Sequence, residues 1–277
     1  MNMLNLSKRC LKKDKEKMKR ILKICVWIFI ITYLVLVPGF IVDRLEKTPC
    51  NSIGISMPDS LTSRFVTKED ILTIINKRDE QILGYPIGRL NTREIETRLA
   101  LHPALKKVEV YKTIGGQLHI EAIQRVPVVR IMNSNGRSYY LDAEGAVVPF
   151  SVKFTPRVLV ASGYINEPAE VMRELTIKNI DADNNLKQIH ELGCFISSHE
   201  FWQAQIEQIY VNKKGEFELV PRVGAHRIIL GSFEDYRVKF RKLYALYEKG
   251  LNKVGWNRYE TINLKFDGQI VCTKRTY

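Results

Sequence analysis

Histidine and cysteine lie closest together between residues 190 and 199, so this stretch is the first candidate for chemistry. His190 and His199 are each followed by a glutamate, which is how the His-Glu-x-x-His motif of zinc proteases begins. The second histidine must come four residues later to reach the same face of a helix, but those positions hold Cys194 and Gln203. Neither zinc motif is complete.

Cys194 could instead act as a nucleophile or join the two histidines around a metal ion. We favour a plainer interpretation, in which it is a core cysteine flanked by two partly exposed imidazoles. Asp142 and Glu144 are better explained as turn residues than as an acid–base pair. The sequence also lacks the Gly-x-Ser-x-Gly, Ser-x-x-Lys, Gly-x-Gly-x-x-Gly and P-loop motifs. We therefore predict a protein that is not an enzyme, with no catalytic residues, no metal site and no cofactor.

The rest of the chain is arranged around an apolar segment near its start, residues 24–42, which contains no charged residue. As a helix it would span about 28 Å, close to the hydrocarbon thickness of a bilayer. Pro38 and Gly39 fall near its far end, where a kink is tolerated. The segment predicts a single transmembrane helix that is kept as a signal anchor. A cleaved signal peptide is the alternative, but it would have a shorter apolar region and a small-x-small cleavage site.

The charges on either side of this helix predict its orientation. Residues 1–23 carry nine Lys or Arg and two Asp or Glu, a net charge of +7, whereas residues 43–47 sum to zero. The positive-inside rule places the basic tail in the cytoplasm and the bulk of the chain outside it. We expect the tail to contact lipid phosphates rather than nucleic acid.

Net charge and cysteine number limit the functions and structures that the exported part could have. The whole chain has a net charge of +13, of which the tail supplies +7, and the rest is spread thinly. This distribution argues against a nucleic-acid surface. The five cysteines are too few for a disulfide scaffold, and the sequence leaves open whether any two of Cys50, Cys194 and Cys272 are bonded.

Residues 43–50 form a polar linker, and residues 51–131 then follow the order strand, helix, helix, strand, strand. The first helix begins at Thr67-Lys-Glu-Asp70, a threonine N-cap with an acid three residues on. The last two strands meet at Ile114-Gly-Gly-Gln117, because glycine accepts the positive φ of a tight turn. This order predicts a small α+β layer, with two helices on a three-stranded sheet.

Residues 132–277 alternate in short apolar runs that are typical of strands, and they predict a β-rich domain with flanking helices. The expected elements are a hairpin turn at Asp142-Ala-Glu-Gly145, a helix over residues 183–193, a helix capped by Ser232-x-x-Asp235, and final strands at residues 262–266 and 269–273. The apolar stripe of the capped helix is Tyr236, Phe240, Leu243, Tyr244 and Tyr247. Its basic residues fall off that stripe and face either solvent, an acidic partner or lipid.

Six short motifs stand in a characteristic order along most of the chain: Phe65-Val-Thr-Lys-Glu-Asp-Ile71, His102-Pro-Ala-Leu-Lys-Lys-Val-Glu-Val110, Gln124-Arg-Val-Pro-Val128, Asp142-Ala-Glu-Gly145, Ile228-Ile-Leu-Gly231 and Ile262-Asn-Leu-Lys-Phe266. This order resembles the FtsQ/DivIB family of bacterial cell-division proteins. Two positions depart from the family, because Gln124 and Asn263 stand where an acid is usual.

The resemblance implies that residues 51–131 are a POTRA (polypeptide-transport-associated) domain and that residues 132–277 carry partner-binding surfaces. It implies a non-enzymatic bitopic scaffold of the plasma membrane at the division septum, with most of the chain in the periplasm, linking early division proteins to septal peptidoglycan synthesis. The implied partners are FtsB-like and FtsL-like division proteins and other divisome components, and neither nucleic acid nor a small-molecule substrate. The alternative is a POTRA-bearing envelope export or assembly factor.

Two groups of residues are predicted to bind partners. The terminal strands would offer an unpaired sheet edge for β-augmentation, and the resemblance assigns Lys265 and Phe266 to contact with the FtsB-like partner. The rest of this edge consists of Gln269, Ile270, Val271, Cys272 and Thr273. Arg125 and Pro127 close the POTRA-like domain and would form either a recruitment surface or a simple strand terminator. For Phe266 the alternative is a place in the protein's own core.

Overall fold

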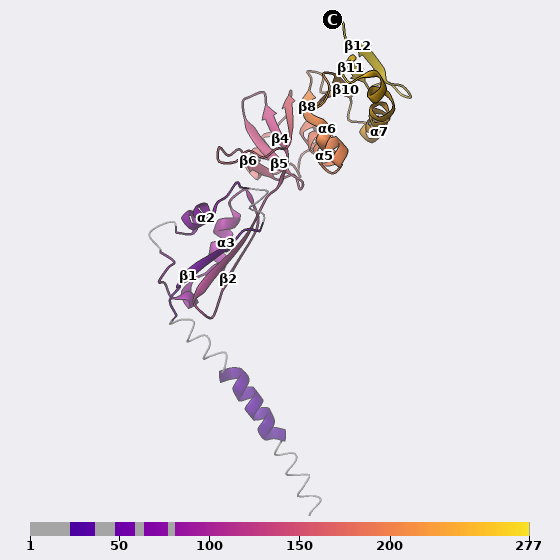
Figure 1. Cartoon of the computed structure of the whole chain (residues 1–277). Coiled ribbons are helices and arrows are strands. Elements are labelled where there is room, and N and C mark those ends of the chain that lie inside the picture. The colour runs from indigo at the N-terminus through magenta and orange to yellow at the C-terminus, as the bar shows by residue number, and fades with distance from the viewer. Residues whose placement is uncertain (1–22, 37–47, 59–63, 77–80, 277) are drawn as a thin grey trace, which may run out of the picture. The chain divides into compact units, whose positions relative to one another are not determined.

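A computed structural model of the chain describes residues 23–36, 48–58, 64–76 and 81–276 (Figure 1). The chain forms two compact units. The first comprises residues 1–56, 75–96 and 109–120, and the second comprises residues 57–74, 97–108 and 121–277. The division therefore runs through the predicted POTRA-like region, whose first helix and strand ends group with the C-terminal part of the chain.

The apolar segment near the start is helical over residues 23–36, and its side chains are exposed. Thr32 donates its hydroxyl to the carbonyl of Ile28, at 2.8 Å, which satisfies this polar group within the helix. Among the residues that the structure describes, no helix is both long and apolar enough to cross a membrane. Residues 37–42 of the predicted span, and the basic tail 1–22, lie outside the described residues.

A three-stranded sheet with two α-helices follows, in the predicted order of elements. The elements are β1 (Ser52–Ser56), α2 (Lys68–Ile75), the short 3₁₀ helix η1 (Ile87–Arg89), α3 (Thr92–Ala100), β2 (Leu105–Lys112) and β3 (Gln117–Gln124). The strand order is β1-β3-β2, so the last strand lies in the middle. The α+β layer predicted from the sequence is confirmed.

Local sequence explains where these elements begin and turn. Asp70 and Thr67 form a capping box at the start of α2, because each side chain accepts the other's backbone N–H, at 3.0 and 3.3 Å. The turn between β2 and β3 places Gly116 at a φ of +82°. A Cβ there would lie 2.7 Å from the carbonyl oxygen of Pro49, so glycine is required on steric grounds as well.

The C-terminal part is a single mixed sheet of nine strands. These are β4 (Pro127–Asn133), β5 (Ser138–Asp142), β6 (Val147–Pro149), β7 (Leu159–Gly163), β8 (Ile206–Val211), β9 (Phe217–Pro221), β10 (Arg227–Gly231), β11 (Tyr259–Asn263) and β12 (Val271–Lys274). Their order is β12-β11-β10-β9-β8-β7-β4-β5-β6. β7 pairs in parallel with both β4 and β8, and β10 pairs in parallel with β11. The predicted β-rich domain is therefore confirmed, with parallel pairings that local patterns do not reveal.

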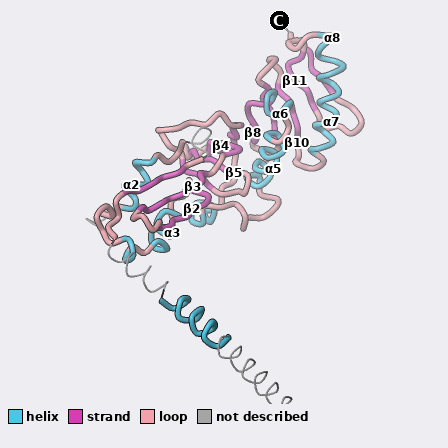
Figure 2. Tube along the Cα trace, turned by 60° about the horizontal axis from the view of Figure 1, so that its bottom comes forward, coloured by secondary structure: helices cyan, strands magenta, loops and turns pink. Residues whose placement is uncertain are grey.

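Helices cover this sheet and build one hydrophobic core with it (Figure 2). They are α4 (Ala169–Glu174), α5 (Asn185–Ser197), α6 (Glu200–Gln205), α7 (Tyr236–Leu246), the π-helical turn η2 (Tyr247–Leu251) and α8 (Asn252–Val254). The helix predicted over residues 183–193 is present as α5, but it begins two residues later and extends to Ser197. The Asn184 side chain caps it by accepting the N–H of Leu186. Gly193 lets α5 approach β4 closely, since an added Cβ would lie 3.3 Å from Cβ of Val129.

The start of α7 differs from the sequence prediction. Asp235, not Ser232, is the N-cap residue, and it adopts a left-handed φ of +50° without a side-chain cap bond. Ser232 instead contributes its carbonyl oxygen, which accepts a bond from Nζ of Lys239 at 2.8 Å. The predicted apolar stripe is otherwise confirmed, except that Tyr244 is 44% exposed.

Gln124 ends β3 as a buried polar residue with two specific bonds. Its side-chain oxygen accepts the N–H of Val66, at 2.9 Å, and its amide nitrogen donates to the carbonyl of Val66, at 3.2 Å. A neutral amide satisfies a backbone donor and acceptor together, whereas a carboxylate cannot donate. A glutamine at this position therefore meets both backbone groups of Val66.

We therefore expect Gln124→Glu to lower the free energy of unfolding at neutral pH by about 2 kcal/mol, because the carbonyl of Val66 loses its donor and faces a buried charge. The loss should shrink at acid pH, where a protonated carboxyl can donate again. Gln117→Glu, on the exposed end of the same strand, is the matched control. Equal melting temperatures of the two variants across pH would contradict this role.

Candidate partner-binding surface

The two strands β11 and β12 form an antiparallel hairpin at one edge of the nine-stranded sheet. Thr261 pairs with Thr273, Ile262 with Cys272 and Asn263 with Val271. β11 is also bonded to β10, but no described strand lies beyond β12. One side of the β12 backbone is therefore available for pairing.

The side chains of β12 divide into an inner and an outer set. Cys272 packs against the hydrophobic core together with Ile270, and burial raises the pKa of the Cys272 thiol. Val271 is 41% exposed, and Thr273 is also exposed. The predicted edge residues thus do not share one role, since Ile270 and Cys272 hold the strand to the core while Val271 and Thr273 face outward. Gln269 is exposed in the connection before the strand.

Lys265 and Phe266 lie in the turn between these strands and not in a strand, so the predicted strand over residues 262–266 is wrong at its end. β11 stops at Asn263 because the side-chain oxygen of Asn263 accepts the N–H of Lys265, at 3.0 Å, which bends the chain. Leu264 then donates its N–H to the carbonyl of Ile229 on β10, at 2.9 Å, and is buried. The second predicted strand also shifts, from residues 269–273 to Val271–Lys274.

Lys265 already has a partner within the chain. Its ammonium forms an ion pair with the carboxylate of Glu216, and the hydrogen bond from Lys265 lowers the pKa of that carboxyl group. Its stem packs on Gly231, where an added Cβ would lie 2.6 Å from Cγ of Lys265. The sequence could not reveal this contact, because Glu216 lies in the turn just before β9, 49 residues before Lys265, and nothing in the local pattern links the two residues.

Phe266 has an exposed ring on a fixed backbone. The side chain is 46% exposed, so it does not fill the protein's own core. Nζ of Lys242, on α7, donates to the carbonyl of Phe266 at 3.0 Å and holds the turn in place. Such an anchored, exposed aromatic ring is able to insert into a partner at low entropic cost.

Arg125 and Pro127 lie away from this edge, in the connection after β3 and at the start of β4, and are largely covered. Nη1 of Arg125 is 2.7 Å from Oδ2 of Asp142, and the two side chains are 20% and 5% exposed. Pro127 is buried and opens β4, where it pairs with Asp142. Since β4 is separated from β12 by five strands in the sheet order, these residues do not join the β12 edge in one site.

Cys194, within the histidine- and cysteine-containing stretch 190–199, is an unactivated thiol. Sγ of Cys194 is 3.5 Å from Nε2 of His190, which also bonds the carbonyl of Asp142 at 2.8 Å. Burial, followed by the nearby carboxylates, raises the pKa of Cys194, so the thiolate that a nucleophile requires is disfavoured. Within the described parts of the chain, no group of three His, Cys, Asp or Glu residues could hold a metal ion.

Comparison with known proteins agrees with this architecture. A family model described as "FtsQ/DivIB, C-terminal related" matches residues 126–273, which is more than half of the chain. The chain belongs to the FtsQ/DivIB family. A POTRA-like domain model matches residues 48–123, the region of the three-stranded sheet. A curated relative, "Cell division protein FtsQ" of Rhodothermus marinus, is 29% identical over 198 residues, covering 70% of this chain and 69% of the relative.

Family membership makes this chain a cell-division protein of the FtsQ/DivIB type, and proteins of this family are non-enzymatic membrane proteins of the division septum. The POTRA-like match stops at residue 123, just before Gln124 and Arg125. Gln124 bonds Val66, which precedes it in the sequence, and Arg125 pairs with Asp142, which follows it. These two residues therefore belong to the packing at the end of β3.

We expect Arg125→Glu to lower the free energy of unfolding by about 3 kcal/mol or more, because the nearly buried carboxylate of Asp142 would lose its partner and meet a like charge. Lys106→Gln removes the neighbouring ion pair with Glu144, whose side chains are about half exposed, and should cost about 1 kcal/mol or less. Thermal unfolding measures both. A stable Arg125→Glu protein that fails to reach the septum would instead support a recruitment surface.

Proposed function

We propose that this protein is a bitopic scaffold of the division septum that captures FtsB-like and FtsL-like partners by adding one of their segments to the edge of β12. The observation that supports this most directly is an open sheet edge beside an exposed aromatic ring. Main-chain pairing along β12 would supply affinity, and outward side chains would supply selectivity.

The two edge strands of the sheet differ in how their backbones are covered, and this difference favours β12 as the strand that binds a partner. β6 at the opposite edge is covered, because the N–H of Val147 donates to the carbonyl of Leu175, at 2.8 Å, and Ala146 pairs with Thr176. β6 also ends at Pro149, which has no N–H to offer. β12 has no such cover among the described residues.

The side chains near β12 suggest what a partner segment would contact. Phe266 and Val271 present apolar surface, and Lys274 follows at the exposed end of the strand. A partner strand with an apolar pocket for Phe266 and a carboxylate opposite Lys274 would complement this edge. Lys265 is a weaker candidate than the family resemblance implied, because its ammonium is already paired with Glu216.

The proposed function also requires a membrane anchor. The uncharged segment 24–42 and the +7 tail before it would hold the protein in the plasma membrane and leave the sheet outside the cytoplasm. The predicted domains, a tail at 1–23, a span at 24–42, a linker at 43–50, a POTRA-like domain at 51–131 and a β domain at 132–277, form part of this proposal.

We expect Phe266→Ala to weaken capture of the FtsB–FtsL pair by about 30-fold, the loss of about 2 kcal/mol that is typical of a hot-spot aromatic. Tyr164→Ala is the matched control, because Tyr164 is 48% exposed and lies after β7, away from the edge. Affinity and melting temperature should be measured on the same samples of full-length protein. Undiminished binding by folded Phe266→Ala protein would place the partner site elsewhere.

A reporter that is active only after export should be active when fused after Tyr277, since the basic tail is expected to stay in the cytoplasm. Exchanging the nine basic residues of the tail for serine should reduce that activity by weakening the orientation signal. A reporter that works only in the cytoplasm serves as the converse measurement. Its activity at Tyr277 would overturn the proposed topology.

A further inference from the structure

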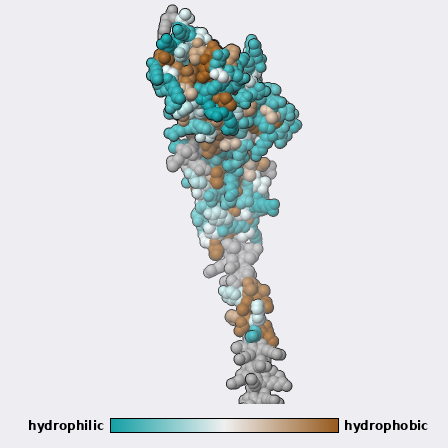
Figure 3. All heavy atoms as spheres, turned by 90° about the vertical axis from the view of Figure 1, so that its right-hand side faces the viewer, coloured by the Kyte–Doolittle hydropathy of each residue, from teal (hydrophilic) through white to brown (hydrophobic). Residues whose placement is uncertain are grey.

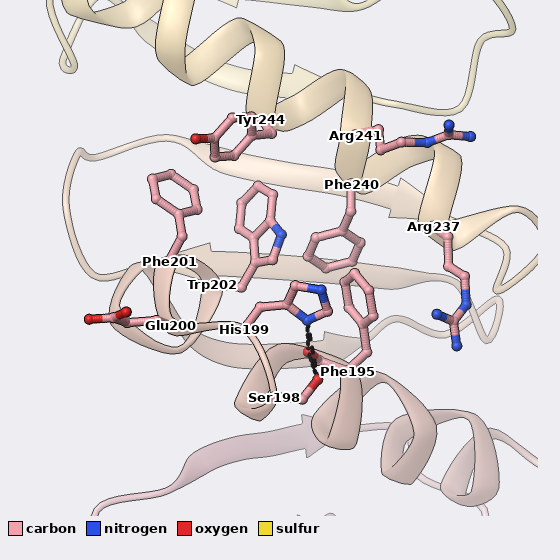
Figure 4. A pocket seen from close by; sticks show the side chains of 10 residues that line it. All are labelled: Phe195, Ser198, His199, Glu200, Phe201, Trp202, Arg237, Phe240, Arg241 and Tyr244. Carbon is pink, nitrogen blue, oxygen red and sulfur yellow. Dashed lines mark hydrogen bonds between the residues drawn. The ribbon is translucent and has the colours of Figure 1, made fainter.

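A pocket of about 770 Å³ lies between the helices that cover the nine-stranded sheet, and the edge strand takes no part in it (Figure 4). Its lining residues come from the end of α5, from α6 and from α7. Five of them are aromatic: Phe195, Phe201, Trp202, Phe240 and Tyr244. The volume is within the range of about 300–1,000 Å³ that is usual for ligand pockets.

The spacing of residues on α7 creates one wall of this pocket. Arg237, Phe240, Arg241 and Tyr244 follow at intervals of three and one, so they share one face of the helix. Phe240 also belongs to the core-facing stripe, and it is 1% exposed. The pocket face is thus a second face beside the one that packs on the sheet.

The aromatic walls are preformed. Trp202 is 5% exposed, and its ring lies 4.9 Å from that of Phe240, so the two form a buried floor. Phe201 and Tyr244 meet edge to face with centroids 4.9 Å apart, yet they are 39% and 44% exposed. A buried aromatic floor beside an exposed aromatic rim resembles an interface hot spot, which receives an apolar side chain of a partner.

The rim is cationic on one side. Arg237 stacks on Phe195 and Tyr236, with its guanidinium 5.5 and 5.2 Å from their centroids. In the part of the chain that the structure describes, neither Arg237 nor Arg241 forms an ion pair with an Asp or Glu. Glu200, the one acidic lining residue, lies at the far end of the pocket from both arginines (Figure 4).

We infer that this pocket is a second docking site, which takes an amphipathic helix of a partner protein with apolar side chains on one face and carboxylates beside them. The apolar side chains would enter between Phe201 and Tyr244, and the carboxylates would pair with Arg237 and Arg241. The protein's own tail is excluded as an occupant by its charge of +7. A concave aromatic floor suits a protruding side chain better than a flat lipid surface.

Two further observations support a partner on this part of the molecule. α7 contains no acidic residue, so the positive field of its arginines is not offset within the helix. In the face shown in Figure 3, hydrophobic side chains gather in the C-terminal part of the molecule among hydrophilic ones. Electrostatic attraction would steer an acidic segment to the helices, while the edge of β12 remains free for strand pairing.

The test uses full-length protein in phosphatidylcholine nanodiscs and three synthetic peptides. The probe is a labelled helical peptide of about 14 residues, four turns, with Leu and Phe at i, i+3, i+4 and i+7 and Glu beside them. The comparison peptides carry Lys in place of Glu, or the same residues in scrambled order. Fluorescence anisotropy is measured for the wild type, Tyr244→Ala and the double variant Arg237→Glu/Arg241→Glu.

We expect the acidic peptide to bind the wild type at least about tenfold more tightly than either comparison peptide, and the double variant to lose at least about tenfold. Tyr244→Ala should lose about fivefold or more. Lys253→Glu is the matched charge reversal, on an exposed residue of α8 outside the pocket, and should bind like the wild type. Binding of FtsB–FtsL is measured in parallel, so that failure here is distinguishable from failure of the edge-strand proposal.

Equal binding of the acidic, basic and scrambled peptides would overturn the inference, as would equal affinity of the wild type and the double variant. Absence of peptide binding would do so too. If α6 and α7 were instead protected from hydrogen exchange only in nanodiscs that contain phosphatidylglycerol, the surface would be a lipid contact and the inference would be wrong.

Discussion

An open β-sheet leaves unpaired backbone groups at two edges, and this constraint organises the C-terminal part of the protein. Each edge must be covered, blocked or offered to another chain. β6 is covered by the pairing of Val147 with Leu175 and blocked by Pro149. β12 is held to the core through Ile270 and Cys272 but has no described strand outside it. Among the described strands, β12 is therefore the edge whose backbone groups are available to another chain.

α7 connects this edge to the helical layer. One face of the helix packs into the core through Phe240 and Leu243, and the next face lines the aromatic pocket. Lys242 donates to the carbonyl of Phe266 and fixes the turn between the last two strands. A single helix therefore supports two surfaces of different chemistry, one that offers backbone pairing and one that offers aromatic rings and guanidinium groups.

The end of β3 shows how two adjacent side chains connect separate parts of the chain. Gln124 bonds the backbone of Val66 just before α2, and Arg125 pairs with Asp142 at the end of β5. Asp142 also accepts the N–H groups of Glu144 and Ala146 within that turn. Most buried polar groups in proteins are hydrogen-bonded, because an unmet donor or acceptor is costly, and the bonds of Gln124 and Asp142 meet this requirement.

Local sequence alone determined the elements whose signals are short-range. The capping box at Thr67, the turn at Gly116 and the alternation along β3 predicted the first sheet correctly, because caps, turns and side-chain periodicity depend on residues a few positions apart. The resemblance in motif order likewise led to the right family. Only the tertiary structure decided that Lys265 is paired with Glu216, that the partly buried Arg125 pairs with the buried carboxylate of Asp142, and that Phe266 stands exposed in a turn. Each of these depends on which distant strands become neighbours, and parallel pairings such as β10 with β11 leave no local pattern from which that could be read.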